Sequence, residues 1–324
     1  MPGWAVYVAG AAAGQPPAGP RQPLAFAPWL FLQPAHQALQ SLAFPTLSFY
    51  LEDEAAGRSV AQLFVVLGYP EASQASSPGQ APVGGVQLAP GVPLAALHHL
   101  LAVAEHTLRQ HGQRRLHLRG YPFCYNPAGA ALLAEALRQR AYAVVLAEEN
   151  YHLDPARDYV AHLHPSERRR LRRCQQQGLV PEQEPPLLLP WAYEFIARCR
   201  HERGQALSLP LARVQELFRA FPRQHLLFSV RKPSGDWAAL TIAIQVSEHV
   251  LYNFYPASPL ADNHLSPVVL LNESLHAYAR ASGLAVVDLG TSTLPSGAPN
   301  ASLLQFKRRL GGIAGPKLSW GKAL

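Results

Sequence analysis

Acidic residues, cysteines and long apolar runs are scarce in this sequence. The chain of 324 residues has 21 Asp and Glu against 28 Lys and Arg, which gives a formal net charge of +7. Hydrophobic residues make up 48% and charged residues only 15%, a globular composition that excludes a disordered chain. No apolar run reaches the roughly 18 residues that a membrane helix needs, so we expect no membrane span.

The cysteines and histidines exclude several common sites. Cys124, Cys174 and Cys199 are widely spaced without a CxxC pair, so we expect no disulfide framework or zinc knuckle and favour a reducing cytoplasm. The 14 histidines show no HExxH spacing and no carboxylate placed beside them, so we expect no metal site. The N-terminal stretch lacks a basic residue before its apolar run, and we interpret it as a strand and not as a signal peptide.

Positive charge is concentrated in two stretches. The segment 166–173, SERRRLRR, has five arginines and one glutamate, and no acid follows Asp288. Arginines without i,i+4 acidic partners either bind phosphate or form a solvated helix face, and both interpretations stay open. The segment 307–309, KRR, similarly either contacts a ligand's phosphate or carboxylate or complements the end of a helix.

The hydrophobic period predicts the same order of elements twice. The second half has helical patterns at 165–177, 191–203 and from 210, and then three antiparallel strands at 225–231, 237–246 and 250–256. A helix at 267–282, a buried strand at 284–290, a helix at 301–312 capped by Asn300 and a short last strand at 317–320 follow. The first half repeats this order more faintly, which predicts two related α+β domains, residues 1–153 and 154–324.

Several segments of the second half carry a family likeness. They are ERRRLRRCQQQGL (167–179), LYNFYPAS (251–258), SPVVLLNESL (266–275), VVDLG (286–290) and LLQFKRRLGG (303–312). In this order they resemble the GNAT superfamily, and in particular the bacterial tandem-GNAT proteins allied to the Fem-type (FemABX-like) peptidyltransferases. The resemblance implies two GNAT-like domains, each a mixed, mainly antiparallel sheet flanked by helices. The N-terminal domain would be degenerate and shape the acceptor side, and the C-terminal domain would bear the active cleft.

The resemblance implies an N-acyltransferase of GNAT type that needs no metal. Acetyl-CoA or another acyl-CoA would give its acyl group to a primary amine, on a small molecule or a peptide, by direct attack. One alternative is a Fem-type transferase that uses aminoacyl-tRNA and acts on a peptidoglycan precursor. The other is an inactive ligand-binding GNAT-like module. The loop ADNHLSP (261–267) lacks the glycines with which acetyl-CoA enzymes hold the pyrophosphate, which tilts the comparison towards the Fem-type enzymes.

In the fold that the resemblance implies, two neighbouring strand ends splay apart to form the acyl site. Asp288 would orient or deprotonate the amine, or else cap the loop that follows it, and Tyr255 would protonate the leaving group. The helix beginning at Ser266–Val268 would offer N–H groups to an anion. The residues expected to bind donor or substrate are Asn253, Tyr252, Ser266, Val268, Asn300, Lys307, Arg308, Arg169, Arg170 and Arg173.

Overall fold

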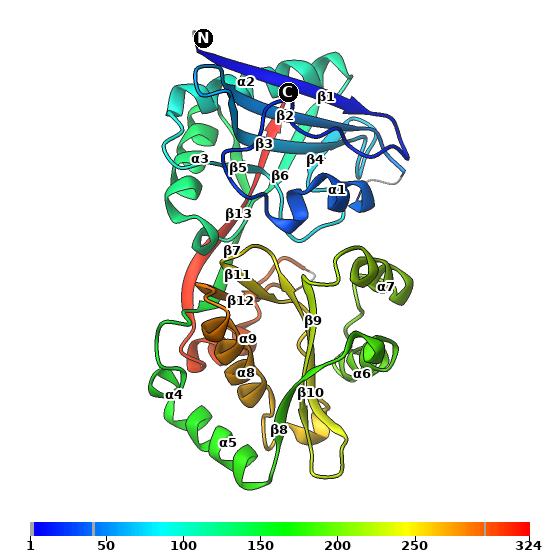
Figure 1. The fold of residues 1–324 in the computed structure, drawn as a ribbon, viewed down its shortest axis with the longest axis vertical. Helices are drawn as coiled ribbons and strands as arrows, with labels where there is room; N and C mark the ends of the chain where they lie inside the picture. Colours follow the sequence, from blue (N-terminus) through cyan, green and yellow to red (C-terminus); the bar gives the residue numbers. More distant parts are fainter. Residues whose placement is uncertain (1–2, 41–42, 295) are drawn as a thin grey trace. The chain divides into compact units, whose positions relative to one another are not determined.

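Two compact units make up the chain. The computed structural model describes residues 3–40, 43–294 and 296–324. One unit contains the residues up to Glu148 together with Gly315–Leu324, and the other is Glu149–Ala314 (Figure 1). This division lies five residues before the expected boundary at 153 and 154, and it also gives the last ten residues to the first unit. Two long strands carry the chain across the boundary, β7 (Ala143–Leu153) outward and β13 (Ile313–Ala323) on its return.

The first unit is a mixed sheet with two long helices. Its elements are β1 (Trp4–Ala11), η1 (Leu30–Leu32), α1 (Pro34–Gln40), β2 (Thr46–Asp53), β3 (Arg58–Leu67), β4 (Gln74–Ser77), β5 (Val86–Leu88), α2 (Leu94–Gln110), β6 (Arg115–Arg119), η2 (Phe123–Tyr125) and α3 (Pro127–Gln139). The strands follow the order β1-β2-β3-β4-β6-β13, with β5 beside β3. The β4–β6 pair is parallel, whereas β1–β2, β2–β3, β3–β4, β3–β5 and β6–β13 pair antiparallel.

The apolar stripe of α2 explains why this helix forms part of the core. Leu97, Leu100, Leu101, Ala104 and Leu108 recur at helical spacing, and all are fully buried. Glu105 is also buried there, and its carboxylate accepts hydrogen bonds from the guanidinium of Arg140 while the ammonium of Lys322 lies 2.8 Å away. The charge on α2 is therefore paired with a residue of the returning strand β13.

The second unit has its own mixed sheet. Its elements are the end of β7, α4 (Tyr159–His162), α5 (Pro165–Gln176), β8 (Val180–Glu184), η3 (Pro186–Leu188), α6 (Leu189–His201), α7 (Leu211–Ala220), β9 (His225–Arg231), β10 (Trp237–Gln245), β11 (Val250–Asn253), η4 (Leu260–Asp262), α8 (Val268–Ala281), β12 (Val286–Thr291) and α9 (Ala301–Arg309). The strand order is β7-β12-β11-β10-β9-β8, and only the β11–β12 pair among these is parallel.

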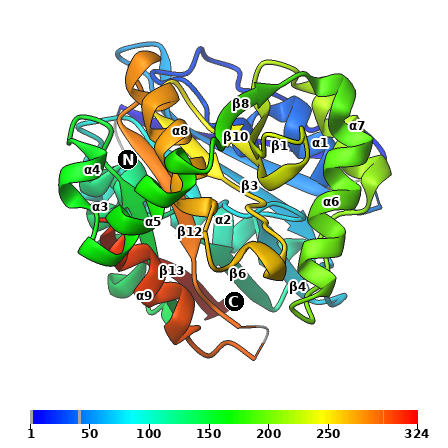
Figure 2. The same ribbon diagram turned by 90° about the horizontal axis from the view of Figure 1, so that it is seen from below.

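Helices cover both faces of this second sheet. Helices α5 and α8 contribute to one apolar core, in which Leu171, Cys174, Leu271 and Leu275 are buried. Helices α6 and α7 contribute to the other core, and Figures 1 and 2 show these two helices together on the opposite side of the sheet from α8. The strands between them are buried on both faces, which explains the nearly continuous apolar sequence of β10.

The predicted fold class is confirmed: both units are α+β, with mainly antiparallel mixed sheets flanked by helices. The three-strand meander, the parallel neighbour of 286–290 and the Asn300 cap are all present. Some expectations were wrong. The sequence reasoning missed β8 and α1, and it gave the last strand as 317–320 where β13 covers Ile313–Ala323.

Candidate functional site

Strands β11 and β12 pair over only three residues and then diverge. Their parallel register joins Val250–Tyr252 to Val286–Asp288. Beyond it, the chain after Asn253 stays with β10, since Phe254 and Tyr255 both donate backbone N–H groups to the Ile242 carbonyl. The end of β12 stays instead with β7, where Gly290 and Thr291 pair with Tyr151 and Asn150. The splayed strand ends that the resemblance implied are therefore present.

A cavity of about 460 Å³ opens where these strands separate. Asn253 and Leu289 from the two strand ends line it, and helices α6, α8 and α9 together with the loops beside them supply its remaining wall. Of the residues expected to bind donor or substrate, five line it: Asn253, Ser266, Val268, Asn300 and Lys307. The cavity thus brings these five residues together, although they lie up to 54 positions apart in the sequence. Their roles in binding stay predictions.

Lys307 is a buried cation in the wall of the cavity. Its side chain is 5% exposed, and Nζ donates hydrogen bonds to the carbonyl oxygens of Gly290 and Thr291, both at 2.8 Å. Burial lowers the pKa of this amine to about 8, while the nearby Asp288 carboxylate acts in the opposite direction. An ammonium has three donors, and these two carbonyls engage two of them, so one donor remains for a ligand in the cavity.

Asp288 shapes the end of β12. It is 1% exposed, and its Oδ1 accepts hydrogen bonds from Asn150 Nδ2 and from the backbone N–H of Gly290, both at 2.8 Å. The strand register shifts between Asp288 and Gly290, and Gly290 has φ +73°. The Tyr252 ring lies so close that a Cβ on Gly290 would be 3.2 Å from it. These contacts match the expected alternative in which Asp288 caps the following turn, and a role as base stays a prediction.

Asn253 is held by neighbours from two elements. Its Oδ1 accepts a hydrogen bond from Thr241 Oγ1 at 2.7 Å, and its Nδ2 donates to Asn272 Oδ1 at 3.2 Å. Asn272 in turn donates to the Val268 carbonyl in the first turn of α8. This chain of amides fixes the end of β11 against α8 and gives one corner of the cavity a rigid polar lining.

Tyr255 and Arg308 do not line the cavity. Tyr255 is 4% exposed, its hydroxyl is hydrogen-bonded to Ser208, and burial raises its pKa. Arg308 donates to the Tyr151 hydroxyl and to Glu149, and most of its side chain is exposed. The proposed proton donor and this proposed binding residue therefore lie outside the cavity wall, and their functional roles stay predictions.

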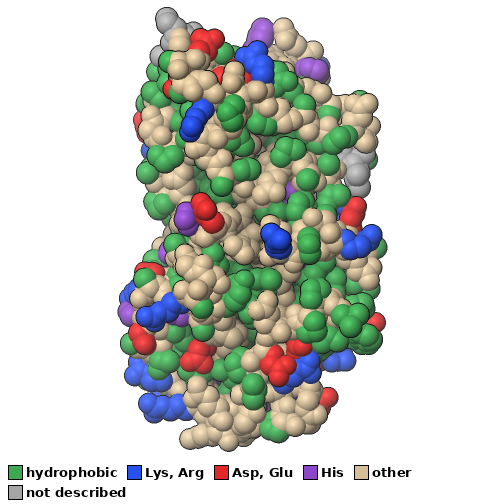
Figure 3. All heavy atoms as spheres, viewed as in Figure 1, with side chains coloured by type: hydrophobic (Ala, Val, Ile, Leu, Met, Phe, Trp, Pro, Cys, Tyr) green, Lys and Arg blue, Asp and Glu red, His purple; other side chains and the backbone are tan. Residues whose placement is uncertain are grey.

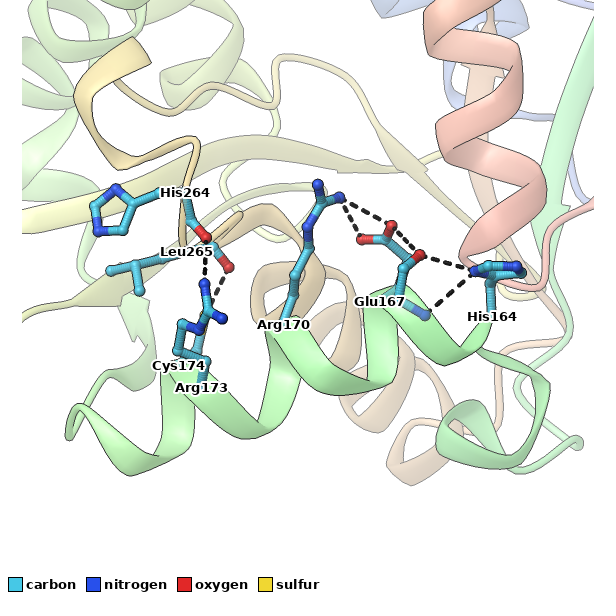
Figure 4. Close-up of polar contacts among 8 residues, drawn as sticks. His164, Glu167, Arg170, Arg173, Cys174, His264 and Leu265 are labelled. Atoms are coloured by element: carbon cyan, nitrogen blue, oxygen red, sulfur yellow. Dashed lines mark hydrogen bonds and ion pairs between the residues drawn. The ribbon is translucent and has the colours of Figure 1, made fainter.

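The arginines of α5 also lie away from the cavity lining. Arg170 donates to both oxygens of the buried Glu167, and Arg173 donates to the His264 carbonyl at 3.2 Å (Figure 4). Arg169 and Arg172 are exposed, and basic side chains gather over α5 at the lower left of Figure 3. The helix thus has internal partners for part of its charge, and it presents the rest to solvent.

The turn before α8 uses most of its own N–H groups. The backbone N–H groups of Leu265 and Ser266 both donate to the Asp262 carbonyl, and Pro267 has no N–H. The N–H of Val269 donates to the Ser266 carbonyl, and Ser266 has φ +54°. No side chain caps this helix. Few donors are therefore left for the pyrophosphate that a glycine-rich loop would hold.

The sequence reasoning missed two cationic residues of the site. Arg200 and Arg203, near the C-terminal end of α6, line the cavity beside Cys199 and Gln205. Together with Lys307 they give the cavity three cationic side chains, and no Asp or Glu is among its described lining residues. Charge counting could not find them, because their segment, CRHERG, has two arginines against one glutamate and so an excess of only one positive charge.

The described residues contain no group of three or more His, Cys, Asp or Glu side chains placed to hold a metal ion. Among the helices of the described residues, none combines the length and the apolar character needed to cross a membrane.

Solved structures share this fold. FemX aligns with a TM-score of 0.64 at 12% identity, covering 86% of this chain and 87% of that one. L-PGS from Bacillus licheniformis has a TM-score of 0.53 at 12% identity, covering 81% of each chain. A tandem GNAT protein from the clavulanic acid biosynthesis pathway has a TM-score of 0.50 at 14% identity, covering 86% of this chain and 82% of its own. No protein-family model matches the chain, and no curated protein matches it. The chain therefore has the tandem-GNAT fold, which confirms the expected likeness at the level of fold.

Proposed function

We propose that the chain is an N-acyltransferase whose reaction takes place in the cavity of the second unit. The observation that carries the proposal is the divergence of β11 and β12 beside the buried ammonium of Lys307. Direct transfer needs a site that aligns an amine with an activated carbonyl and stabilises one oxyanion. A cationic cavity between separated strand ends supports this chemistry.

The proposed step is attack of a neutral primary amine on the acyl carbonyl carbon. A C–N bond forms, the carbonyl oxygen becomes an oxyanion, and collapse breaks the bond to the leaving oxygen or sulfur. The third N–H of Lys307 would stabilise the oxyanion or protonate the leaving atom, and the attacking nitrogen loses a proton that can restore the ammonium. With a pKa of about 8, this lysine is mostly charged at neutral pH and still able to exchange a proton.

An aminoacyl-tRNA is the donor that the site favours. The turn before α8 engages most of its own N–H groups and contains a proline where acetyl-CoA enzymes present free donors to a pyrophosphate. The likeness to FemX, a Fem-type protein, points the same way. This reverses the order of donors expected from the sequence. The acceptor would be a small-molecule or peptide amine, such as the peptidoglycan precursor of Fem-type enzymes.

A coenzyme A thioester remains the second candidate donor. The structure of the tandem GNAT protein that shares this fold is of a form without AcCoA, which makes AcCoA the ligand associated with that protein. Either donor, together with the thiols of Cys174 and Cys199, which form no disulfide, fits a cytoplasmic place of action. The role of the first unit in shaping the acceptor side stays a prediction.

The test measures donor binding and transfer separately. Radiolabelled aminoacyl-tRNA and acyl-CoA are each mixed with the protein and a panel of amines, and the Lys307→Met variant is expected to lose about 100- to 1,000-fold in rate. If neither donor binds or is consumed, the proposal is wrong. Binding of a donor without turnover by any amine would favour an inactive ligand-binding module.

The salt dependence of binding shows whether α5 binds tRNA. Neutralising Arg169 and Arg172 to glutamine should reduce the slope of log affinity against log salt by about 0.7 to 0.9 for each phosphate that is no longer neutralised. Arg219→Gln is the matched control, because Arg219 is an exposed arginine on α7 of the same unit. An equal change in the control would show that net charge, and not α5, determines tRNA binding.

A further inference from the structure

Arg200 is a shielded cation without an acidic partner. It lies at the penultimate position of α6 and lines the cavity, with its guanidinium carbon 5.2 Å from the centre of the Tyr255 ring. Its Nη1 donates a long hydrogen bond of 3.4 Å to Gln205 Oε1, and its buried Nε has no partner. Within the described part of the chain, no carboxylate lies within ion-pair distance of it.

Three other partly shielded arginines have the acidic partner that Arg200 lacks, whereas Arg168 donates to the backbone carbonyls of Ala161 and Leu163 instead. Arg140 pairs with Glu105, Arg213 with Glu216, and Arg231 with Glu182 and Glu184, at side-chain exposures of 22%, 13% and 27%. The Nε of Arg200 is buried, and this burial lowers the pKa of its guanidinium. A shielded charge without a counter-ion is costly. A ligand with a negatively charged group would supply the missing counter-ion and so offset this cost.

The other cations of the cavity have their donors engaged by the protein. Arg203 donates from Nη1 to the carbonyls of Cys199 and Ser258 and from Nη2 to Asn263 Oδ1, so it joins α6 to the loop after β11. Lys307 uses two donors on backbone carbonyls. Of the three cationic residues that line the cavity, Arg200 therefore has the most N–H donors available to a ligand.

We propose that Arg200 binds an oxyanion, a carboxylate or a phosphate, on the acceptor substrate of this cavity. The inference rests on the proposed function for the identity of the ligand as the acceptor. Arg200 belongs to α6 and Lys307 to α9, so the anionic group and the reacting carbonyl are held by different walls of the cavity. The planar fork of Arg suits either anion, and stacking on Tyr255 holds that fork in place.

The first experiment detects anion binding without any turnover. In protein labelled with ¹⁵N in its arginine side chains, the Arg200 Nε–H resonance is followed by NMR during titration with inorganic phosphate and, separately, with acetate. A saturable shift of this resonance is expected, and the anion that binds more tightly identifies the source of the oxyanion. The Arg198 resonance is the internal control, because Arg198 is an exposed arginine of the same helix that does not line the cavity.

The second experiment compares acceptors with and without the anionic group. For acceptors bearing a free carboxylate or phosphate, Arg200→Gln should raise KM by about 10- to 100-fold, the loss expected for a charge-assisted hydrogen bond. Acceptors without the anion, which are the methyl esters of the carboxylates and the dephosphorylated alcohols of the phosphates, should be affected little. Arg200→Lys should restore part of the difference. Arg198→Gln should change neither, and thermal melting of each variant verifies folding.

The outcomes separate this inference from the proposed function. An Arg200 resonance that neither anion shifts, or an Arg200→Gln variant that treats acid and ester acceptors as the wild type does, overturns the inference and leaves acyl transfer intact. Saturable binding at Arg200 in a protein that consumes no donor supports the anion site and overturns the proposed function instead.

Discussion

Above neutral pH, the buried ammonium of Lys307 is expected to lose its proton while the protein remains folded. Burial lowers its pKa to about 8, whereas a lysine in an unfolded chain titrates near 10.4. Between these values the unfolded chain binds more protons than the folded one, so the free energy of unfolding rises with pH. Below the folded pKa the buried charge costs stability, and above it that cost disappears. The two pKa values give a gain of about 2.5 kcal/mol between about pH 7 and about pH 10.

Two measurements check this prediction. A ¹⁵N NMR titration of the Lys307 Nζ should show a midpoint near pH 8. Urea unfolding of the wild type and of Lys307→Met, at both pH values, should show the wild type gaining the predicted stability relative to the variant, because other titrating groups are common to both chains. A midpoint close to that of a solvated lysine would refute the reasoning, and so would a stability difference that does not change with pH.

Other substitutions test the contacts around the site and in the first unit. Asp288→Asn should lower the pKa of Lys307 further, since the carboxylate acts to raise it, and the same NMR titration measures the change. Gly290→Ala should destabilise the protein by about 1–3 kcal/mol in urea unfolding, because its φ of +73° and the aromatic ring 3.2 Å from the new Cβ both oppose a side chain. Lys322→Gln should cost about 1–3 kcal/mol, because it leaves the buried Glu105 with one basic partner in place of two. Unfolding that is unchanged by either of the last two substitutions would contradict the packing around Gly290 or the pairing of Glu105.

The sequence predicted the elements whose patterns are local. The alternating and buried strands β9–β11, the amphipathic helix α8 and the Asn300 cap all follow from hydrophobic period and capping chemistry. Strand β8 was missed because VPEQE is mostly polar and exposed. It is an edge strand that pairs through its backbone and through ion pairs such as Arg231–Glu182.

The candidate site was predictable only in part. The ends of β11 and β12 and the position of Lys307 followed from the order of elements and the family likeness, and the cavity includes them. Nothing in the sequence singled out Arg200. Its importance depends on the lack of a carboxylate close to it in the folded chain, which the sequence alone does not reveal. The arginines of α5 gave a strong signal, yet Arg170 is satisfied by Glu167 three residues away, a pair that a count of net charge does not reveal.

The strand β13 has a consequence for biosynthesis. Its residues Ser319–Ala323 pair with β6, so the first unit obtains one of its strands from sequence that follows the entire second unit. A ribosome makes these residues only after the second unit has been translated. The edge of β6 that pairs with β13 therefore has to stay without this partner strand until the second unit has been translated.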